Sequence, residues 1–287
     1  MRSNWYRGIV VGVDGSAESM AAVDWAALAA DRHAARLTVL GAYVTPPGHL
    51  VTTMGVDIAE LRADARYAVE RSVARLNGAR PGGRVVEQRI VLGSPAYMLA
   101  QTSRSSDLVV VGRRGLGTWD RAVLGSVSGA LAASAPGPVA VVPAGAGTGD
   151  PSRVVVGVSG DDAGPQLDMA FAEAQQRSCP LEVVHAFDPD PLTEFGGPSA
   201  LRDDVVREEV ADQVARWSDK YPTVTHTVAF RSGNTVEAIL HQLSPDDLVV
   251  VGGRQHSPAI GHIRHSVPDA VLRRAPCPVI VVHEQRR

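Results

Sequence analysis

The sequence has little of several residues and patterns that would each indicate a particular class of protein. Only two of its 287 residues are cysteine, Cys179 and Cys277, and aromatic residues make up 5%. Two cysteines far apart in sequence match no thiol or metal-binding motif, so they indicate neutral thiols in a reducing cytoplasm. No apolar run approaches the roughly 20 residues that cross a bilayer, and residues 1–8 carry no secretory signal. We therefore expect a cytoplasmic protein without a membrane span.

Lysine is almost absent, and this excludes one common class of nucleotide enzyme. The single lysine, Lys220, follows no glycine-rich loop, so the chain is not a P-loop NTPase. The Rossmann fingerprint, the nucleophile elbow of hydrolases and the paired histidines of zinc proteases are missing as well.

The net charge is −3, with +4 on residues 1–147 and −7 on the remainder. The charge of +4 on the first half is too small to indicate a nucleic-acid-binding protein, but it is compatible with a small anionic ligand in that half.

What the sequence does contain is an internal repeat at an offset of about 140 residues. Three blocks recur in the same order: 9–15 as 154–160, 107–112 as 247–252, and 135–142 as 275–282. The repeated unit is long enough to be a whole domain. We expect one domain over 1–145 and a second over 152–287, joined by the small and flexible residues of 144–151.

Apolar runs alternate with helical patterns inside each unit. Their continuous apolarity is typical of strands in a parallel sheet that is covered on both faces. The alternation predicts a doubly wound α/β domain with five parallel strands in the order 3-2-1-4-5 and about four helices. The strands are expected at 8–13, 37–43, 85–91, 107–111 and 138–142, and again at 153–158, 181–187, 224–230, 247–251 and 278–282.

Four helices are expected in the first unit. Ser16 is placed to cap one that runs to about His33. Ser94 and Pro95 begin a third, and Ser126 begins a fourth that ends near Ala135. The second helix, over 57–78, is expected to bury one face, made of Ile58, Leu61, Ala65, Ala68, Val69 and Val73.

Ligands of open α/β sheets bind outside the carboxyl ends of the strands, so two loops of the first unit are candidate ligand-binding loops. One is the turn 14–16 after the first strand, and the other is the glycine-rich loop 112–126 after the fourth. The second loop ends at a helix N-terminus that carries a hydroxyl group, which is the chemistry of a phosphate cradle. A glycine-rich surface turn without a ligand explains the same pattern equally well.

The spacing Gly112-x2-Gly115-x9-Gly125-Ser126 resembles the ATP-binding signature of universal stress proteins. Residues 11–16 are similar to the first strand and turn of that family, and 136–139 to its last strand. The resemblance covers nearly the whole chain as two tandem domains, an arrangement similar to that of mycobacterial and other actinobacterial members. It implies an ATP-binding regulator that reports cellular energy or stress to a protein partner, which the sequence does not identify.

The resemblance also implies a role for each matching residue of the first unit. Asp14 would accept hydrogen bonds from the adenosine end, and the backbone of Ala42 would contact adenine. The ribose and phosphates would lie against the residues that remain: Gly12, Val111, Gly112, Gly115, Gly125, Ser126 and Val127.

Four charged residues near the motif are our own additions to this set. Arg113, Arg114 and Arg121 are candidate charge partners for phosphate, although solvated surface arginines would give the same pattern. Asp120 is a candidate for Mg²⁺ bridged to phosphate, but a single carboxylate offers little to that ion.

The second unit departs from the motif. Asp14 is replaced by Ser159, Gly115 by Gln255 and Gly125 by His265, while Gly252 and Ser266 persist. Side chains at these glycine positions would intrude where the backbone must approach phosphate. We expect the second domain to bind ATP weakly or not at all. Its loop also carries His256, His262 and Arg264, which without a carboxylate or thiol indicate a solvated or anion-facing loop rather than a metal site.

Other functions stay open at this point. A slow ATPase or an autophosphorylating protein that uses Ser126 is one alternative, although no general base, lysine or paired carboxylate is identifiable near the loop. A cyclic-AMP-binding module is another, since some relatives bind that nucleotide, and an interaction module without any nucleotide is a third. The strands that end at Val142 and Val282 are candidate edges, so we expect a homodimer or a pairing of the two domains.

Overall fold

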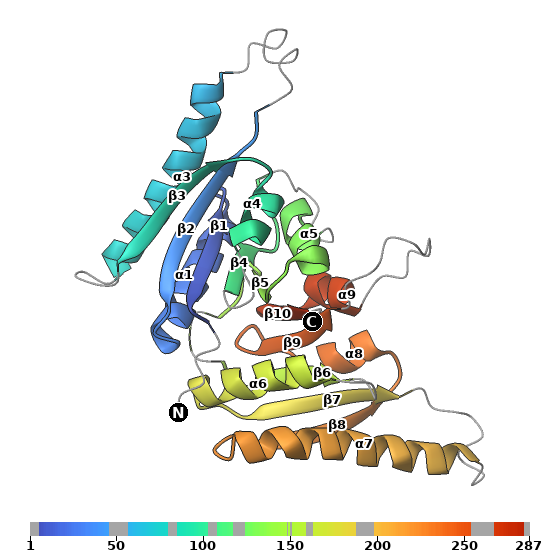
Figure 1. Cartoon of the computed structure of the whole chain (residues 1–287). Helices are drawn as coiled ribbons and strands as arrows, with labels where there is room; N and C mark the ends of the chain where they lie inside the picture. Colours follow the sequence, from blue (N-terminus) through green and yellow to red (C-terminus); the bar gives the residue numbers. More distant parts are fainter. Residues whose placement is uncertain are drawn as a thin grey trace. The chain divides into compact units, whose positions relative to one another are not determined.

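A computed structural model describes residues 6–45, 57–79, 85–102, 108–116, 124–147, 149, 151–158, 163–187, 198–253 and 267–283. In the helix that begins at residue 198, side chains are described only from residue 205 onward. The polypeptide divides into two compact units, one over Met1–Thr148 and the other over Gly149–Glu284. Figure 1 shows the elements of both. Each unit is described by itself.

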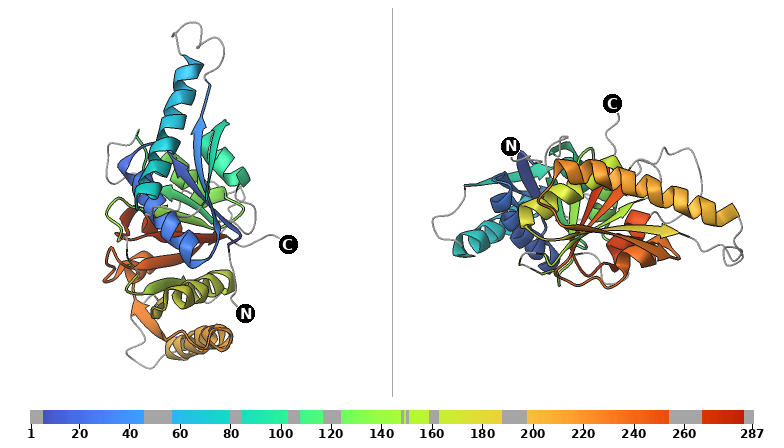
Figure 2. Two further views of the ribbon diagram at one scale, coloured as in Figure 1. Left: turned by 90° about the vertical axis from the view of Figure 1, so that its left-hand side faces the viewer. Right: turned by 90° about the horizontal axis from the view of Figure 1, so that it is seen from below.

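The first unit is a parallel sheet in the order β3-β2-β1-β4-β5, which confirms the predicted order. Helices cover both faces of this sheet (Figures 1 and 2). In chain order its elements are β1 (Gly8–Val13), α1 (Ala17–Arg32), β2 (Arg36–Tyr43), α3 (Ile58–Ala79), β3 (Val86–Leu92), α4 (Pro95–Thr102), β4 (Leu108–Gly112), α5 (Ser126–Ser134) and β5 (Val139–Val142).

The second unit repeats this plan in its own parallel strands, in the order β8-β7-β6-β9-β10. The repeated sequence blocks therefore form equivalent strands, and the tandem α/β architecture is confirmed. Its elements are β6 (Val154–Val158), α6 (Gly164–Arg177), β7 (Leu181–Phe187), α7 (Pro198–Lys220), β8 (His226–Ser232), α8 (Thr235–Leu240), β9 (Leu248–Gly253), α9 (Val267–Arg274) and β10 (Val279–His283).

The central strands of both units are buried, but β3 is not. In β1, Ile9 and Val11 are fully inaccessible to solvent, as continuous apolarity predicts. The expectation that 85–91 is also covered on both faces is wrong, because Glu87, Gln88 and Arg89 are exposed. In the sheet order of its unit, β3 is the outermost strand, beside β2.

The helices begin where the capping signals predict, with one correction to a buried face. Ser16 is the N-cap of α1, and its hydroxyl accepts a hydrogen bond from the Ser19 amide at 3.1 Å. In α3 the buried stripe begins only at Ala65, whereas Ile58 is 41% exposed and Leu61 is half-buried. The first turns of α3 project past the end of β3 (Figure 1), so they have no sheet to cover.

Candidate functional site

Two loops meet at the carboxyl ends of β1 and β4, which are neighbours in the sheet. Asp14 joins them. One of its carboxylate oxygens accepts a hydrogen bond from the Ser16 amide at 3.0 Å, and the other accepts from the Leu116 amide at 3.0 Å. Gly15 between them has a φ of +85°, a left-handed conformation that favours glycine. The turn after the first strand thus holds the loop after the fourth.

A cavity of about 650 Å³ opens at this junction. Its size falls within the range of small-molecule and cofactor sites. All nine residues that the family motif singles out in the first unit line this one space: Gly12, Asp14, Ala42, Val111, Gly112, Gly115, Gly125, Ser126 and Val127. The motif residues are spread over more than 100 positions in the sequence, and the sheet order brings them together.

One end of the cavity is apolar. Side chains from β2 and α4 form it, including Leu40, Pro95 and Leu99. Gly12 keeps this end open, because a Cβ atom there would lie 2.7 Å from the Leu99 side chain. Such a narrow space between strand backbone and apolar side chains suits a flat ring.

The other end is built from the N-terminus of α5. The N-cap residue is Gly125, so no side chain caps the helix. The Gly129 amide closes the first helical turn by donating to the Gly125 carbonyl at 2.9 Å, and the amides of Ser126, Val127 and Ser128 precede it. Amides in the first turn have no partner inside their own helix, and the helix dipole is positive there. This end of the cavity therefore suits an anion.

Sequence reasoning missed the apolar and hydroxyl side chains that complete the lining, and it also missed a charged residue behind the cavity, Glu18. It occupies the first turn of α1 and is only 5% exposed. Its carboxylate accepts hydrogen bonds from the Arg114 amide at 2.7 Å and from the Arg114 Nε at 2.8 Å, and it forms an ion pair with the same guanidinium. The sequence showed only that Glu18 is an acidic residue near a helix N-terminus. Such residues are ordinarily solvated, so this position did not indicate a buried side chain.

The added charged candidates are distributed unevenly. Arg114 lines the cavity, with its guanidinium on Glu18. Arg113 is not among the lining residues, but its carbonyl accepts a hydrogen bond from the Gly125 amide at 2.9 Å and so ties the loop to α5. Arg121 and Asp120 lie outside the described residues. Within the described ranges, no group of three or more potential metal-ligating side chains occurs.

Part of the site geometry recurs in the second unit. Gly157 corresponds to Gly12, and a Cβ atom there would lie 2.5 Å from Ile239, as one at Gly12 would meet Leu99. Gly252 also persists at the end of its strand. The replacements Ser159, Gln255 and His265 and the retained Ser266 lie outside the described residues, as do His256, His262 and Arg264. The expected loss of ATP binding in this unit stays a prediction.

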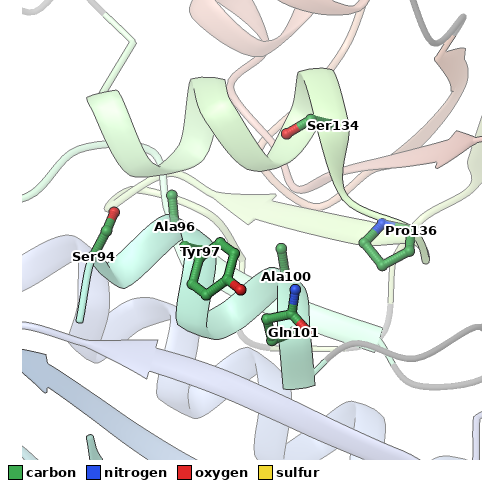
Figure 3. A pocket seen from close by; sticks show the side chains of 7 residues that line it. All are labelled: Ser94, Ala96, Tyr97, Ala100, Gln101, Ser134 and Pro136. Atoms are coloured by element: carbon green, nitrogen blue, oxygen red, sulfur yellow. The ribbon is translucent and has the colours of Figure 1, made fainter. Parts of the chain in front are cut away.

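A second cavity, of about 690 Å³, lies between α4 and α5 (Figure 3). Helix α4 presents Ala96, Tyr97 and Gln101 to it, and Ser134 lies across from them at the end of α5. Its lining carries no charged side chain and no residue of the motif.

Within the described ranges, every helix is too short or too polar to span a bilayer.

Comparison with known proteins agrees with this architecture. The model of the universal stress protein family matches residues 6–143 and 151–283. A universal stress protein of Mycolicibacterium smegmatis is 33% identical over 286 residues, covering 96% of each chain. One from Mycobacterium tuberculosis is 32% identical over 292 residues, covering 96% of this chain and 97% of that protein.

A solved structure shows the same fold over the whole length. The crystal structure of a universal stress protein from Archaeoglobus fulgidus superposes with a TM-score of 0.67 at 19% identity, covering 99% of each chain. The family match, the full-length mycobacterial relatives and the shared tandem fold lead to one conclusion. The chain belongs to the universal stress protein family, with two family domains in tandem.

Proposed function

We propose that the first unit binds ATP in the cavity between β1, β4 and α5, and that its nucleotide state regulates a partner protein. The observation that carries this proposal is that all nine motif residues line a single cavity of about 650 Å³. An apolar end and an amide-lined end match the two chemically different halves of a nucleotide.

The glycines of the loop fit a phosphate group that lies against backbone. A Cβ atom at Gly115 would collide with the Asp14 carboxylate, and one at Gly125 would lie 3.0 Å from the Arg113 carbonyl oxygen. The cavity wall is therefore bare backbone at these positions. Phosphate oxygens would accept from the first amides of α5 and from the Ser126 hydroxyl, next to the positive end of the helix dipole.

Asp14 retains capacity for a ligand while it holds the loops together. Each carboxylate oxygen has about two acceptor sites, and each accepts one hydrogen bond from the backbone, those of Ser16 and Leu116. The exposed carboxylate can thus accept a further hydrogen bond from a ribose hydroxyl or an adenine amino group at the open side of the turn.

Binding and regulation fit the cavity better than rapid hydrolysis does. The ionisable side chains among its lining residues are Asp14 and Arg114, and the Arg114 guanidinium already pairs with Glu18. Efficient phosphoryl transfer needs groups that position water and stabilise the developing charge. The described lining supplies backbone amides and hydroxyl groups, which are suited to holding a triphosphate.

Isothermal titration calorimetry and native mass spectrometry of the full chain with ATP, cyclic AMP and adenosine test the proposal. We expect one ATP per chain, and we expect Asp14→Ala to abolish it. Asp57→Ala is a matched control, because Asp57 accepts the same type of hydrogen bond two residues ahead, from the Ala59 amide at 2.8 Å, at the start of α3 and away from the cavity.

Two results would contradict the proposal, and a third would contradict the expected stoichiometry. No binding at millimolar ATP would reject the nucleotide site. Tighter binding of cyclic AMP than of ATP would replace the ligand and remove the role of the α5 amides in holding a triphosphate. Two ATP molecules per chain would show that Ser159, Gln255 and His265 do not disable the second unit.

A further inference from the structure

Glu18 is a buried acid just outside the candidate nucleotide cavity. It does not line the cavity, yet it lies directly behind the loop that does. The backbone of Glu18 is in close contact with Gly112, where a Cβ atom would lie 2.7 Å from the Glu18 carbonyl carbon. Helix α1 therefore approaches the end of β4 so closely that its first turn supports the start of the loop.

The carboxylate of Glu18 makes two kinds of contact with one residue of this loop. It accepts from the backbone amide of Arg114 at 2.7 Å and from its Nε at 2.8 Å. The backbone bond fixes the orientation of the peptide group between Arg113 and Arg114, one residue before Gly115. The guanidinium bond neutralises the buried charge, which would otherwise be costly at 5% exposure.

Asp14 holds the next turn of the same loop through the Leu116 amide. The amides of Arg114 and Leu116 thus both point at carboxylates of the first-strand turn and α1, so they are not donors to the cavity. Between them stands Gly115, which lines the cavity. Two acidic residues thereby determine which backbone groups the loop presents.

We propose that Glu18 is a positioning residue of the nucleotide site: it holds residues 114–116, which follow β4, in their cavity-lining conformation by accepting the Arg114 amide and pairing with the Arg114 guanidinium. The effect on nucleotide affinity rests on the proposed function. The hold on the loop does not, because it can be measured without any nucleotide.

The test compares Glu18→Gln with the wild-type chain in two measurements. The first is hydrogen exchange of the Arg114 amide by NMR without ligand, where we expect exchange at least about tenfold faster, because a charge-assisted hydrogen bond is replaced by a weaker neutral one. The second is the ATP dissociation constant by calorimetry, which we expect to rise about tenfold for the same reason.

Asp24→Asn is the matched control. Asp24 lies on the same helix and pairs with Arg75 at 2.7 Å, but it does not line the cavity. We expect its Arg114 exchange and its ATP affinity to equal those of the wild type. The double variant Glu18→Gln with Arg114→Gln restores a neutral pair, so its affinity should exceed the value expected from adding the two single effects.

The outcomes separate this inference from the proposed function. Unchanged exchange at Arg114 in Glu18→Gln would overturn the inference, and so would an Asp24→Asn variant that loses affinity to the same extent. A wild-type chain that binds no ATP would reject the proposed function, while faster exchange in Glu18→Gln would still establish the hold on the loop. If Glu18→Gln folds poorly, Arg114→Gln removes only the guanidinium, and a smaller rise in exchange is expected.

Discussion

Gly115 and Asp14 approach each other so closely that no side chain fits between them. A Cβ atom at Gly115 would collide with the Asp14 carboxylate oxygen that accepts the Leu116 amide. Gly115→Ala must therefore either turn the Asp14 carboxylate away from the Leu116 amide or displace this part of the loop. We expect ATP affinity to fall by more than about tenfold, which corresponds to about 1.4 kcal/mol or more of binding free energy, as measured by calorimetry.

Gly129→Ala is the control for this glycine replacement. Gly129 lies inside α5, and a Cβ atom there would make only an ordinary contact with Leu124 at 3.5 Å. Alanine in a helix interior is more stable than glycine by roughly 0.5–1 kcal/mol, so the variant should unfold at higher urea and keep its ATP affinity. Equal losses of affinity in both variants would argue against a specific role of Gly115.

That the motif residues meet at one end of the sheet could be predicted from the sequence, and the contact of Glu18 with this region could not. Glycines and a strand-end aspartate have a recognisable spacing, because the backbone geometry that they permit is local. The partner of Glu18 is Arg114, 96 residues away. An acidic residue in the first turn of a helix is favourable in solvent as well, so its type gives no sign that it is buried.

At the scale of single elements, α1 depends on its cap. The Ser16 hydroxyl accepts from the Ser19 amide at 3.1 Å, and it precedes the turn that carries Glu18. Ser16→Ala should lower the free energy of unfolding by about 1 kcal/mol, measured by urea denaturation. Ser134→Ala is its control, because that hydroxyl donates to a carbonyl of its own helix at an exposed position, and its loss should stay within about 0.5 kcal/mol.

The exposed strand β3 gives a small pH dependence. A hydrogen bond from Arg89 holds the pKa of Glu87 below its ordinary value of 4.5, although burial acts in the opposite direction. Ionised Glu87 therefore stabilises the fold above that value, and the contribution disappears as the pH falls through the lower pKa of the folded chain.

Because the Glu87 side chain is 47% exposed, the contribution should be at most a few tenths of a kcal/mol. Glu87→Gln should lower stability by that amount at pH 7 and by less at pH 3, measured by urea denaturation at both values. A difference of the same size at both pH values would show that the carboxylate charge of Glu87 makes no contribution.

Strand and helix positions were predictable where burial is uniform, and less so at the margins. Valine-rich β1 and β4 are covered on both sides, as their composition indicates. In β3 the polar residues 87–89 already mark an outer strand, but the apolar residues around them suggested burial. Ile58 was expected in the core because its helical spacing is right, yet spacing cannot tell where the sheet beneath a helix ends.

At the scale of the whole molecule, the two units should respond differently to nucleotide. A ligand at one hundred times its dissociation constant stabilises its own site by about 2.7 kcal/mol. We expect saturating ATP to slow hydrogen exchange around β1, β4 and α5 of the first unit and to leave β6 and β9 of the second unit unchanged. Mass spectrometry of peptides from the full chain measures both at once, and equal protection in both units would contradict a single site.

The tandem arrangement follows from the sequence alone, because three repeated blocks in one order require two copies of one fold. The chemistry of the second copy does not follow in the same way. Strands that recur in both copies, such as β6 and β9, show that the sheet is repeated. Ligand recognition depends instead on loops, whose backbone conformation is set by contacts between residues distant in sequence. The contact of Glu18 with Arg114 in the first unit is an example.

One feature of the sheet distinguishes the copies more deeply than the loops do. Gly41 in β2 pairs in register with Val13, and a Cβ atom there would lie 2.7 Å from the Ala65 carbonyl oxygen of α3. The equivalent residue of β7, in register with Val158, is His185. Helix α3 thus rests on bare strand backbone, and the second unit has an imidazole at the same place.

Large side chains surround His185 in the second unit. Its ring lies 5.9 Å from that of Phe230, and the Arg207 guanidinium of α7 stacks over Phe230 at 4.4 Å. A recombinant chain that exchanged α3 and α7 would drive the imidazole into the backbone of one copy and leave a void in the other. The helices of the two halves are therefore not interchangeable at this position, because β2 needs a helix that packs on bare backbone and β7 needs one that leaves room for an imidazole.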